Sequence, residues 1–378
     1  MNEKPLAMRI LVISNNYPSE SIPSRGVFVY NLIQQFAKLG HEITIVAPVG
    51  LLQKTNPSEK GYYGEELGKV YRPKFVSAST KNFFGFNTYR VAELSQIWQV
   101  KKTVARNEIE FDVIYAHFLT NAFIAAGALY SFGKPIYAAI GESDLDVPKS
   151  RFSPSYFKKV SNRIKGFVAV SPFLKDKLVS YGINENKITI KPNAVDFSTF
   201  YKREKIKMRT KHNLPLDKKL LIFVGRFIDH KGPLRLLEAA REIKDVCLLF
   251  VGSGDQKIEG EKVVFCDKTP SEVVPELLSA SDVFVLPTQK EGSCNAIVEA
   301  MACGLPIVSS NIPEVQVQCD PSFSILVDPT DVLAIRNAIE NIISNSNRLE
   351  TMSAAALDYS RNFDIRNRAK SILEFISN

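Results

Sequence analysis

The chain has 378 residues, of which 45% are hydrophobic and 23% charged, the composition of a soluble globular protein large enough for two domains. No apolar run approaches the ~20 residues that a membrane-spanning helix needs, and we expect no secretion signal because the N-terminus lacks a long apolar core with a cleavage site. Five cysteines without CxxC spacing and four scattered histidines predict free thiols in a reducing compartment and no metal site.

The net charge of +8 is distributed unevenly along the chain. Residues 1–195 contain 25 basic and 15 acidic residues, whereas the remainder contains 23 basic and 25 acidic residues. Solubility alone would explain this excess. The alternative is an acidic partner for the first half, such as a phosphorylated substrate, an anionic membrane or nucleic acid. No nucleic-acid motif accompanies the charge, so we expect no nucleic-acid partner.

Apolar, β-rich runs recur along the chain, and helical patterns separate most of them. The predicted strands are 9–14, 42–49, 111–117, 135–140, 166–171, 187–193, 220–225, 246–252, 262–266, 282–287 and 305–310. Continuous apolar strands between helices indicate parallel sheets covered on both faces, an α/β fold. Residues 201–219 are basic and poor in apolar runs, so they are interpreted as a linker between two doubly wound, Rossmann-like domains facing each other across a cleft.

Doubly wound sheets bind ligands at the carboxyl ends of their strands. The loop after the first strand ends at Gly26, just ahead of a predicted helix, and a glycine there would let a ligand approach the helix N-terminus. A plain turn is the simpler explanation of a single glycine. The loop has no GxGxxG pattern, which argues against a nicotinamide dinucleotide.

The loop after strand 220–225 is more informative. Gly225 and Arg226 end the strand, and Lys231 and Gly232 lie where the next helix begins. An arginine with two donors and a lysine acting as a point charge can hold a diphosphate between them. Solvated loop cations are the alternative explanation.

Residues 291–310 predict a short loop, a helix and a buried strand. Free backbone N–H groups that favour a phosphate are expected where this helix opens, at Gly292, Ser293, Cys294 and Asn295. Because Asn295 and Glu299 are four residues apart, they share one helix face. Glu299 is placed to accept two ribose hydroxyls and Glu291 to reach the neighbouring sugar. The alternative is that both carboxylates cap local backbone amides.

Together these motifs resemble the retaining glycosyltransferases of the GT-B fold, the large family 4 group, over essentially the whole chain. The family's most specific signature, two glutamates separated by seven residues, is matched by Glu291 and Glu299, and its Gly-Arg…Lys-Gly clamp by residues 225–232. Residues 190–200, 251–256 and 279–288 match further family patterns, and His117 matches the family's histidine at the cleft.

Three positions depart from the family pattern. Arg25 precedes Gly26 where many relatives have a second glycine, and Ala194 replaces the usual glycine after Asn193. The sequence IGESDL at 140–145 stands where many relatives have His-Gly-Ser-Asp. All three departures lie in or near the half that the resemblance assigns to the acceptor.

The resemblance implies an acceptor-binding domain at residues 1–195, completed by a C-terminal helix at 362–378 that crosses back to it, and a nucleotide-sugar-binding domain at 196–361. It assigns catalysis to Glu291, His117, Arg226 and Lys231. It assigns donor binding to Gly26, Gly225, Arg226, Lys231, Gly252, Glu291, Gly292, Ser293, Cys294, Asn295 and Glu299. No metal and no cofactor besides the donor are expected, because two fixed cations take the place of a metal.

The implied reaction moves a sugar, with retention, from a nucleotide-diphosphate donor to a saccharide or lipid-linked saccharide acceptor. The form EGSCNAIVEA resembles enzymes of surface polysaccharide assembly more than those of sucrose or glycogen synthesis. Two alternatives remain open. One is a nucleotide-sugar epimerase-like enzyme on the same fold, and the other is a catalytically inactive, nucleotide-sugar-binding partner subunit.

We expect a cytoplasmic protein, and one stretch raises the prospect of peripheral attachment to the inner face of the membrane. Residues 149–167 carry six basic and no acidic residues, with Phe152, Tyr156 and Phe157 interleaved. Cations with aromatics suit the headgroup layer of an anionic membrane. The alternative is a solvated helix whose aromatic rings pack inward.

Overall fold

A computed structural model describes residues 7–22, 25–53, 68–76, 82–83 and 86–377. The chain divides into two compact units, Met1–Lys191 with Arg366–Asn378, and Pro192–Ile365. The predicted domain bounds of 195 and 362 lie a few residues from these divisions.

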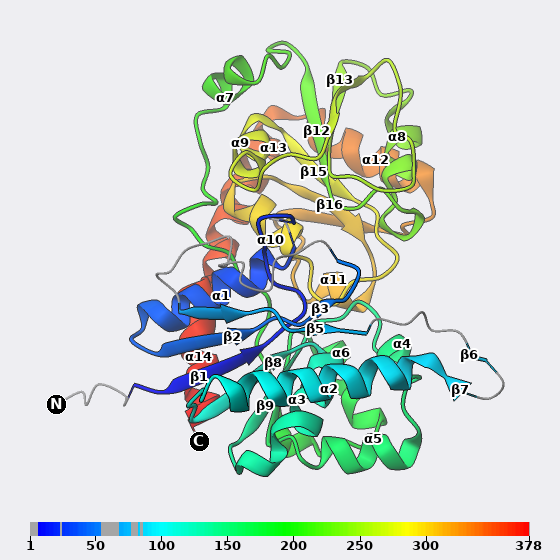
Figure 1. Ribbon diagram of the computed structural model, residues 1–378. Helices are drawn as coiled ribbons and strands as arrows, with labels where there is room; N and C mark the ends of the chain where they lie inside the picture. Colours follow the sequence, from blue (N-terminus) through cyan, green and yellow to red (C-terminus); the bar gives the residue numbers. More distant parts are fainter. Residues whose placement is uncertain (1–6, 23–24, 54–67, 77–81, 84–85, 378) are drawn as a thin grey trace. The chain divides into compact units, whose positions relative to one another are not determined.

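The first unit is built on a parallel sheet of seven described strands in the order β11–β10–β9–β8–β1–β2–β4 (Figure 1). The strands are β1 Arg9–Ile13, β2 Glu42–Val46, β4 Lys69–Tyr71, β8 Val113–His117, β9 Ile136–Ile140, β10 Gly166–Ala169 and β11 Ile188–Ile190. Two-stranded ribbons are formed by β3 Val49–Gly50 with β5 Lys74–Phe75, and by β6 Asn82–Phe83 with β7 Phe86–Asn87. The chain adds β2 and β4 on one side of β1 and then β8 to β11 on the other side, so the strand order reverses between β1 and β8 while the strands stay parallel.

Helices cover both faces of this sheet. One face packs against α1 and α14, whose apolar residues share a core with Ile10 and Tyr115 of the strands. The other face packs against α2, α3, α5 and α6. The helices are α1 Val27–Lys38, α2 Thr88–Arg106, α3 Leu119–Leu129, α4 Asp146–Lys149, α5 Pro154–Ser161, α6 Pro172–Ser180 and α14 Ile365–Ser377.

The second unit repeats the architecture with six parallel strands in the order β14–β13–β12–β15–β16–β17 (Figure 1). They are β12 Lys219–Val224, β13 Val246–Val251, β14 Val263–Asp267, β15 Val283–Leu286, β16 Ile307–Ser310 and β17 Ser324–Val327. The helices are α7 Lys205–Lys211, α8 Pro233–Ala240, α9 Val274–Ala280, α10 Asn295–Ala302, α11 Pro313–Gln316, α12 Val332–Ile343 and α13 Ser346–Ser360. Here the reversal lies between β12 and β15.

The last helix belongs to the first unit, as predicted. The chain leaves the second unit at Ile365, and the side chains of Ala369, Ile372 and Ile376 on α14 are buried in the core that α1 shares with the first sheet. The crossing helix is therefore an integral layer of the first unit.

The predicted linker is wrong. Residues 201–219 contain α7, and Met208 and Leu214 are buried in the core of the second unit. The sequence suggests that Arg209 is a solvated cation. In the structure it is only 4% exposed, because its guanidinium binds Asp282 at 2.6 Å. The segment is part of the second unit rather than a connection between two units.

The aromatic residues of the basic stretch 149–167 pack inward. Phe152 and Phe157 are buried and contact Phe123 at ring-centroid distances of 4.6 and 5.1 Å. The Tyr156 hydroxyl donates to Glu93 at 2.8 Å. The prediction of exposed aromatic anchors is therefore wrong. Within the described residues, none of the helices combines the length and the apolar character that crossing a membrane requires.

Candidate functional site

The reversal of strand order in the second unit gathers the predicted donor residues at one sheet edge. Strands β12 and β15 pair in parallel, so the loops that follow them leave the sheet side by side. The loop after β12 carries Gly225 and Arg226, and the loop after β15 carries Glu291. Such a reversal is where open α/β sheets bind ligands.

Three contacts tie these loops together. The His230 carbonyl oxygen accepts the Gln289 N–H at 2.7 Å and the Thr288 hydroxyl at 3.2 Å. Lys231 Nζ lies 2.5 Å from Glu291 Oε1, and the two side chains are 15% and 7% exposed. A predicted cation and a predicted carboxylate, far apart in the sequence, are therefore direct partners.

The glycines of this edge have a packing role. A Cβ on Gly252 would lie 1.9 Å from the Gly225 carbonyl oxygen, and one on Gly254 would lie 2.3 Å from the Phe227 carbonyl oxygen. Neither position has room for a side chain, because the loop after β13 supports the loop that carries Arg226. The structure thus gives Gly252 a supporting role, and its predicted contact with a donor stays a prediction.

The electrostatics of this edge favour an anion. Arg226 is exposed, and among the described residues its guanidinium has no ion-pair partner. The pKa of His230 is lowered, first by burial and then by the charges of Lys231 and Arg226. The positive charges of Lys231 and Arg226 therefore both act at the position of His230.

Two side chains that have no role in the sequence analysis, those of Asn193 and Gln318, form hydrogen bonds to the loop at the start of α10. Asn193 donates from Nδ2 to the Ser293 carbonyl oxygen at 3.0 Å, and its backbone N–H donates to Ser293 Oγ at 3.3 Å. Gln318 Oε1 accepts the Cys294 N–H at 2.7 Å, so the prediction that this N–H is free for a phosphate is wrong. The helix begins at Asn295 with no side-chain cap and no acidic residue in its first turn. Gly292 lies in the buried loop just before it.

Glu299 lies on α10, four residues after Asn295. Its carboxyl group has no hydrogen-bond or ion-pair partner among the described residues. Burial raises the pKa of Glu299 to about 7. This glutamate therefore differs from Glu291, which already binds a cation, and it retains its full capacity to accept hydrogen bonds.

His117 lies in the first unit, at the end of β8 and at the reversal of that sheet. It is 3% exposed, and its ring lies 5.5 Å from Phe28 and 4.9 Å from Phe118 between centroids. Neither ring nitrogen has a hydrogen-bond partner in the described structure. Burial and the charge of Arg368 lower the pKa of His117 to about 3, so the imidazole is neutral.

The residues after His117 hold an uncommon backbone conformation. Phe118 has a φ of 77°, in the left-handed region that costs a bulky residue free energy. Its N–H donates to the Ala139 carbonyl oxygen at 2.7 Å. Glu142 accepts the Leu119 N–H at 2.6 Å and the Gly141 N–H at 3.1 Å, and burial raises its pKa to about 7. Glu142 belongs to the IGESDL departure, which was the signal that could have found it.

The first unit also explains Gly26. This residue has a φ of 65° just before α1, and a Cβ there would lie 2.0 Å from the Asn16 carbonyl oxygen. Glycine is thus required for the loop to fold back on itself. Its predicted contact with a donor stays a prediction. In the described part of the chain, no three His, Cys, Asp or Glu side chains form a group that could hold a metal ion.

Comparison with known proteins gives the site its context. Residues 26–199 match the family model "Glycosyltransferase Family 4", and residues 204–358 match "Glycosyl transferases group 1". The chain is 28% identical over 350 residues to TuaC of Bacillus subtilis (strain 168), a protein assigned to teichuronic acid biosynthesis as a glycosyltransferase, covering 88% of each chain.

A second relative is WcaL of Salmonella typhimurium, assigned to colanic acid biosynthesis, which is 27% identical over 338 residues with 77% of this chain and 81% of WcaL covered. Among solved structures, HepE of Anabaena in complex with UDP and glucose has the same fold, with a TM-score of 0.74 at 18% identity, over 98% of this chain and 100% of HepE. The two family models between them span most of both units, and the chain belongs to the GT-B-fold glycosyltransferases of the family 4 type.

Proposed function

We propose that this protein is a retaining glycosyltransferase. It transfers a sugar from a nucleoside diphosphate donor to a saccharide or lipid-linked saccharide in the assembly of a surface polysaccharide. The observation that carries the proposal is the edge of the second sheet, where the exposed Arg226 lies beside the Lys231–Glu291 pair and near the uncapped start of α10.

The donor's diphosphate fits the electropositive part of this edge. Arg226 can donate two hydrogen bonds to phosphate oxygens, and Lys231 adds a second charge. The N–H groups of Ser293 and Asn295 supply further donors at the positive end of the α10 dipole. Both would stabilise the negative charge that grows on the diphosphate as the sugar leaves.

The two glutamates accept hydrogen bonds from the hydroxyls of the donor sugar and of the ribose. Glu291 is positioned by its bond to Lys231, so its second carboxylate oxygen is available to a sugar hydroxyl. Glu299, without a partner of its own, accepts ribose hydroxyls. His117, neutral and without a bond at either ring nitrogen, can bind a sugar hydroxyl as donor or acceptor.

In the proposed reaction, the bond between the anomeric carbon and the diphosphate oxygen breaks while the acceptor oxygen attacks from the same face. The acceptor's hydroxyl proton passes to an oxygen of the leaving diphosphate. No redox step and no covalent enzyme intermediate are needed. The protein's contribution is orientation and charge stabilisation. We propose that the two fixed cations supply this stabilisation without a metal.

The place in polysaccharide assembly rests on relatives. TuaC and WcaL are each assigned to the biosynthesis of a polysaccharide, teichuronic acid and colanic acid. The nucleotide donor is supported by HepE, which shares the fold and was solved with UDP and glucose. Neither comparison identifies the donor sugar or the acceptor of this chain.

A screen of nucleoside diphosphate sugars against the purified protein tests the proposal. A bound donor raises the melting temperature by mass action. The donor that binds is then incubated with an acceptor panel, with and without EDTA, and the anomeric configuration of the product is read by NMR. Retention without loss of rate in EDTA supports the proposal. Inversion contradicts the mechanism, and donor binding without turnover on any acceptor favours the inactive partner subunit.

We also propose that the first unit binds anionic membranes through the exposed cations of the stretch 149–167. The phenylalanine rings there are buried, but Lys158, Lys159 and Lys165 are exposed. Cations near an anionic surface contribute about 1 kcal/mol each and are screened by salt. Co-sedimentation with anionic vesicles at low salt, lost with neutral vesicles or high salt, supports this. Equal binding to anionic and neutral vesicles, or no binding to either, contradicts the proposed membrane attachment.

A further inference from the structure

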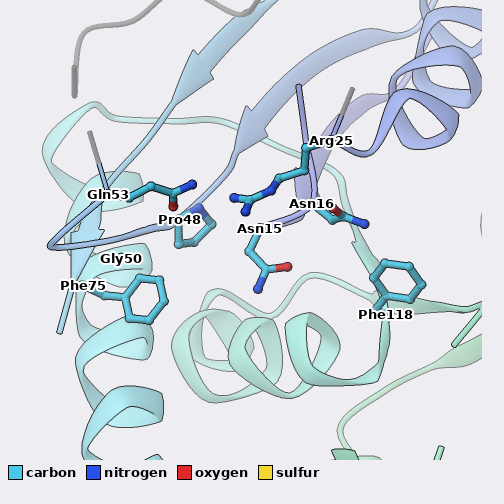
Figure 2. A pocket seen from close by; sticks show the side chains of 8 residues that line it. All are labelled: Asn15, Asn16, Arg25, Pro48, Gly50, Gln53, Phe75 and Phe118. Carbon is cyan, nitrogen blue, oxygen red and sulfur yellow. The ribbon is translucent and has the colours of Figure 1, made fainter. Parts of the chain in front are cut away.

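The first unit has a pocket at the reversal of its own sheet. Its volume is about 310 Å³, and it opens where β1 and β2 end and where β8 turns into α3 (Figure 2). The residues that line it are Asn15, Asn16, Arg25, Pro48, Gly50, Gln53, Phe75 and Phe118. All of them belong to the first unit.

Among the described residues, the lining contains one cation, three amides and no carboxylate. Figure 2 shows the Arg25 guanidinium reaching over the Asn15 amide, into the space between Pro48 and Asn16. Among the described residues Arg25 has no ion-pair or side-chain hydrogen-bond partner, although its backbone is tied to Ile22 at 3.2 Å. An unpaired arginine facing amides favours an anionic group.

A relay of amides fixes how Asn15 faces the pocket. Asn121 is 1% exposed, and its Nδ2 donates to the His117 carbonyl oxygen at 2.6 Å and to Asn15 Oδ1 at 3.0 Å. The oxygen of the Asn15 amide is therefore occupied. Its Nδ2 has no hydrogen-bond partner among the described residues, so it remains able to donate to a bound ligand.

Two aromatic rings complete the lining. Phe75 and Phe118 lie on either side of the Asn15 amide in Figure 2. The backbone of Phe118 is held by its N–H bond to the Ala139 carbonyl oxygen, and Phe75 lies on β5, which pairs with β3. Apolar ring faces next to polar donors suit the C–H faces and hydroxyls of a sugar ring.

We propose that this pocket binds an acceptor sugar that carries a carboxylate, a uronic acid, with the carboxylate on Arg25 and Asn15. The inference rests on the proposed function, because it deepens the acceptor side of that reaction. A carboxylate is favoured over a phosphate because the described lining has a single positive charge, which balances the one charge of a carboxylate and leaves the second charge of a phosphate monoester without a partner.

Binding without a donor tests this on the full-length protein. Titration calorimetry would compare three probes, glucuronate, glucose and glucose 6-phosphate. We expect glucuronate to bind about tenfold more tightly than glucose, the difference that one charge-assisted pair makes. Equal affinities overturn the proposal, as does no binding of glucuronate. Tighter binding of glucose 6-phosphate overturns the choice of a carboxylate.

Variants assign the effect to Arg25. Arg25→Gln should abolish the preference for glucuronate, and Arg25→Lys should retain part of it, because lysine keeps the charge but loses the fork. Should Arg25→Gln fail to fold, the lysine variant alone decides. Lys101→Gln removes an exposed cation of α2 outside the pocket and should leave the preference for glucuronate unchanged. A preference that survives in Arg25→Gln overturns the proposal.

A parallel arm separates this inference from the proposed function. Thermal shift with UDP, GDP and ADP reports the donor site in the second unit. Binding of one nucleotide together with indifference to glucuronate refutes only the pocket's assignment. Failure to bind any nucleotide refutes the proposed function, whatever the sugar does.

Discussion

Lys231 and Glu291 lie 60 positions apart in the sequence and form one ion pair, with Nζ at 2.5 Å from Oε1. The pair joins the loop after β12 to the loop after β15. The residue proposed to stabilise the leaving diphosphate thereby also positions the residue proposed to hold the donor sugar, so the two cannot be changed independently.

Replacing Lys231 by Ala should therefore damage both turnover and stability. It leaves the largely buried Glu291 carboxylate without a partner, at a cost of about 3 kcal/mol in unfolding free energy. Turnover should fall on the order of 10²-fold, as for loss of a transition-state donor. Urea unfolding and steady-state kinetics measure the two effects.

Arg226→Ala is the matched control, because Arg226 is exposed and unpaired among the described residues. It should lower turnover to a similar extent with no change in unfolding free energy. Wild-type turnover in the double variant, Arg226→Ala with Lys231→Ala, would refute the diphosphate clamp.

Donor affinity should depend on pH through Glu299. Burial raises its pKa to about 7 from an ordinary 4.5, so the free protein loses this proton near neutrality. The ionised carboxylate can accept from two hydroxyls, so the donor's Kd should fall between pH 6 and pH 8. Glu299→Gln should bind more weakly and without this pH dependence. A pH profile unchanged in Glu299→Gln would contradict the assignment.

Glu299 should also affect stability. Because its folded pKa is raised, the folded protein holds this proton more tightly than the unfolded chain, and that advantage is lost as pH rises from 4.5 through 7. Relative to Glu299→Gln, the wild type should lose about 3 kcal/mol of unfolding free energy between pH 4.5 and pH 8. Urea unfolding across this pH range measures the difference.

His117 should show the opposite dependence. Its folded pKa of about 3 lies below the ordinary 6.5, so the unfolded state binds a proton more readily and stability falls as pH drops from 6.5 towards 3. His117→Phe keeps a ring against Phe28 and Phe118 and removes this titration. At pH 4.5 the wild type should have lost about 2.5 kcal/mol relative to the variant. Parallel stability curves for the two proteins would contradict a neutral buried imidazole.

Arg209 should prove essential to the second unit. Its guanidinium binds Asp282 and several backbone carbonyl groups. Arg209→Ala leaves the buried Asp282 with Lys205 as its remaining cation and leaves those carbonyl oxygens without their donor, at a cost of about 3 kcal/mol. Lys207→Ala, an exposed position on the same helix, should cost almost nothing. Equal melting temperatures for the two variants would indicate that 201–219 is a linker after all.

Most of the fold could be predicted from the sequence because buried parallel strands are continuous apolar runs, and these stand out without tertiary information. The helices were harder. The α3 segment is buried on almost every side, so it lacks the 3.6-residue alternation that marks a helix. The basic α7 segment imitates a solvated linker, because the partner that allows Arg209 to be buried is Asp282, far along the chain.

The same limit applies to the site. The residue types of the diphosphate clamp are visible in short motifs, but the bond between Lys231 and Glu291 depends on how two loops meet at a sheet edge. The pocket of the first unit is less visible still. Asn15 and Arg25 come from the two ends of the loop between β1 and α1 and Phe75 comes from β5, and no spacing rule connects them.

The C-terminal helix makes the order of synthesis matter for folding. All described strands of the first unit's sheet have left the ribosome once Ile190 has emerged, yet the apolar face that receives Ile372 and Ile376 stays uncovered until α14 is made. Throughout translation of the second unit, the nascent chain therefore exposes an apolar surface to which chaperones can bind. A fragment ending at residue 191 should aggregate on its own, and supplying residues 365–377 as a peptide should keep it in solution.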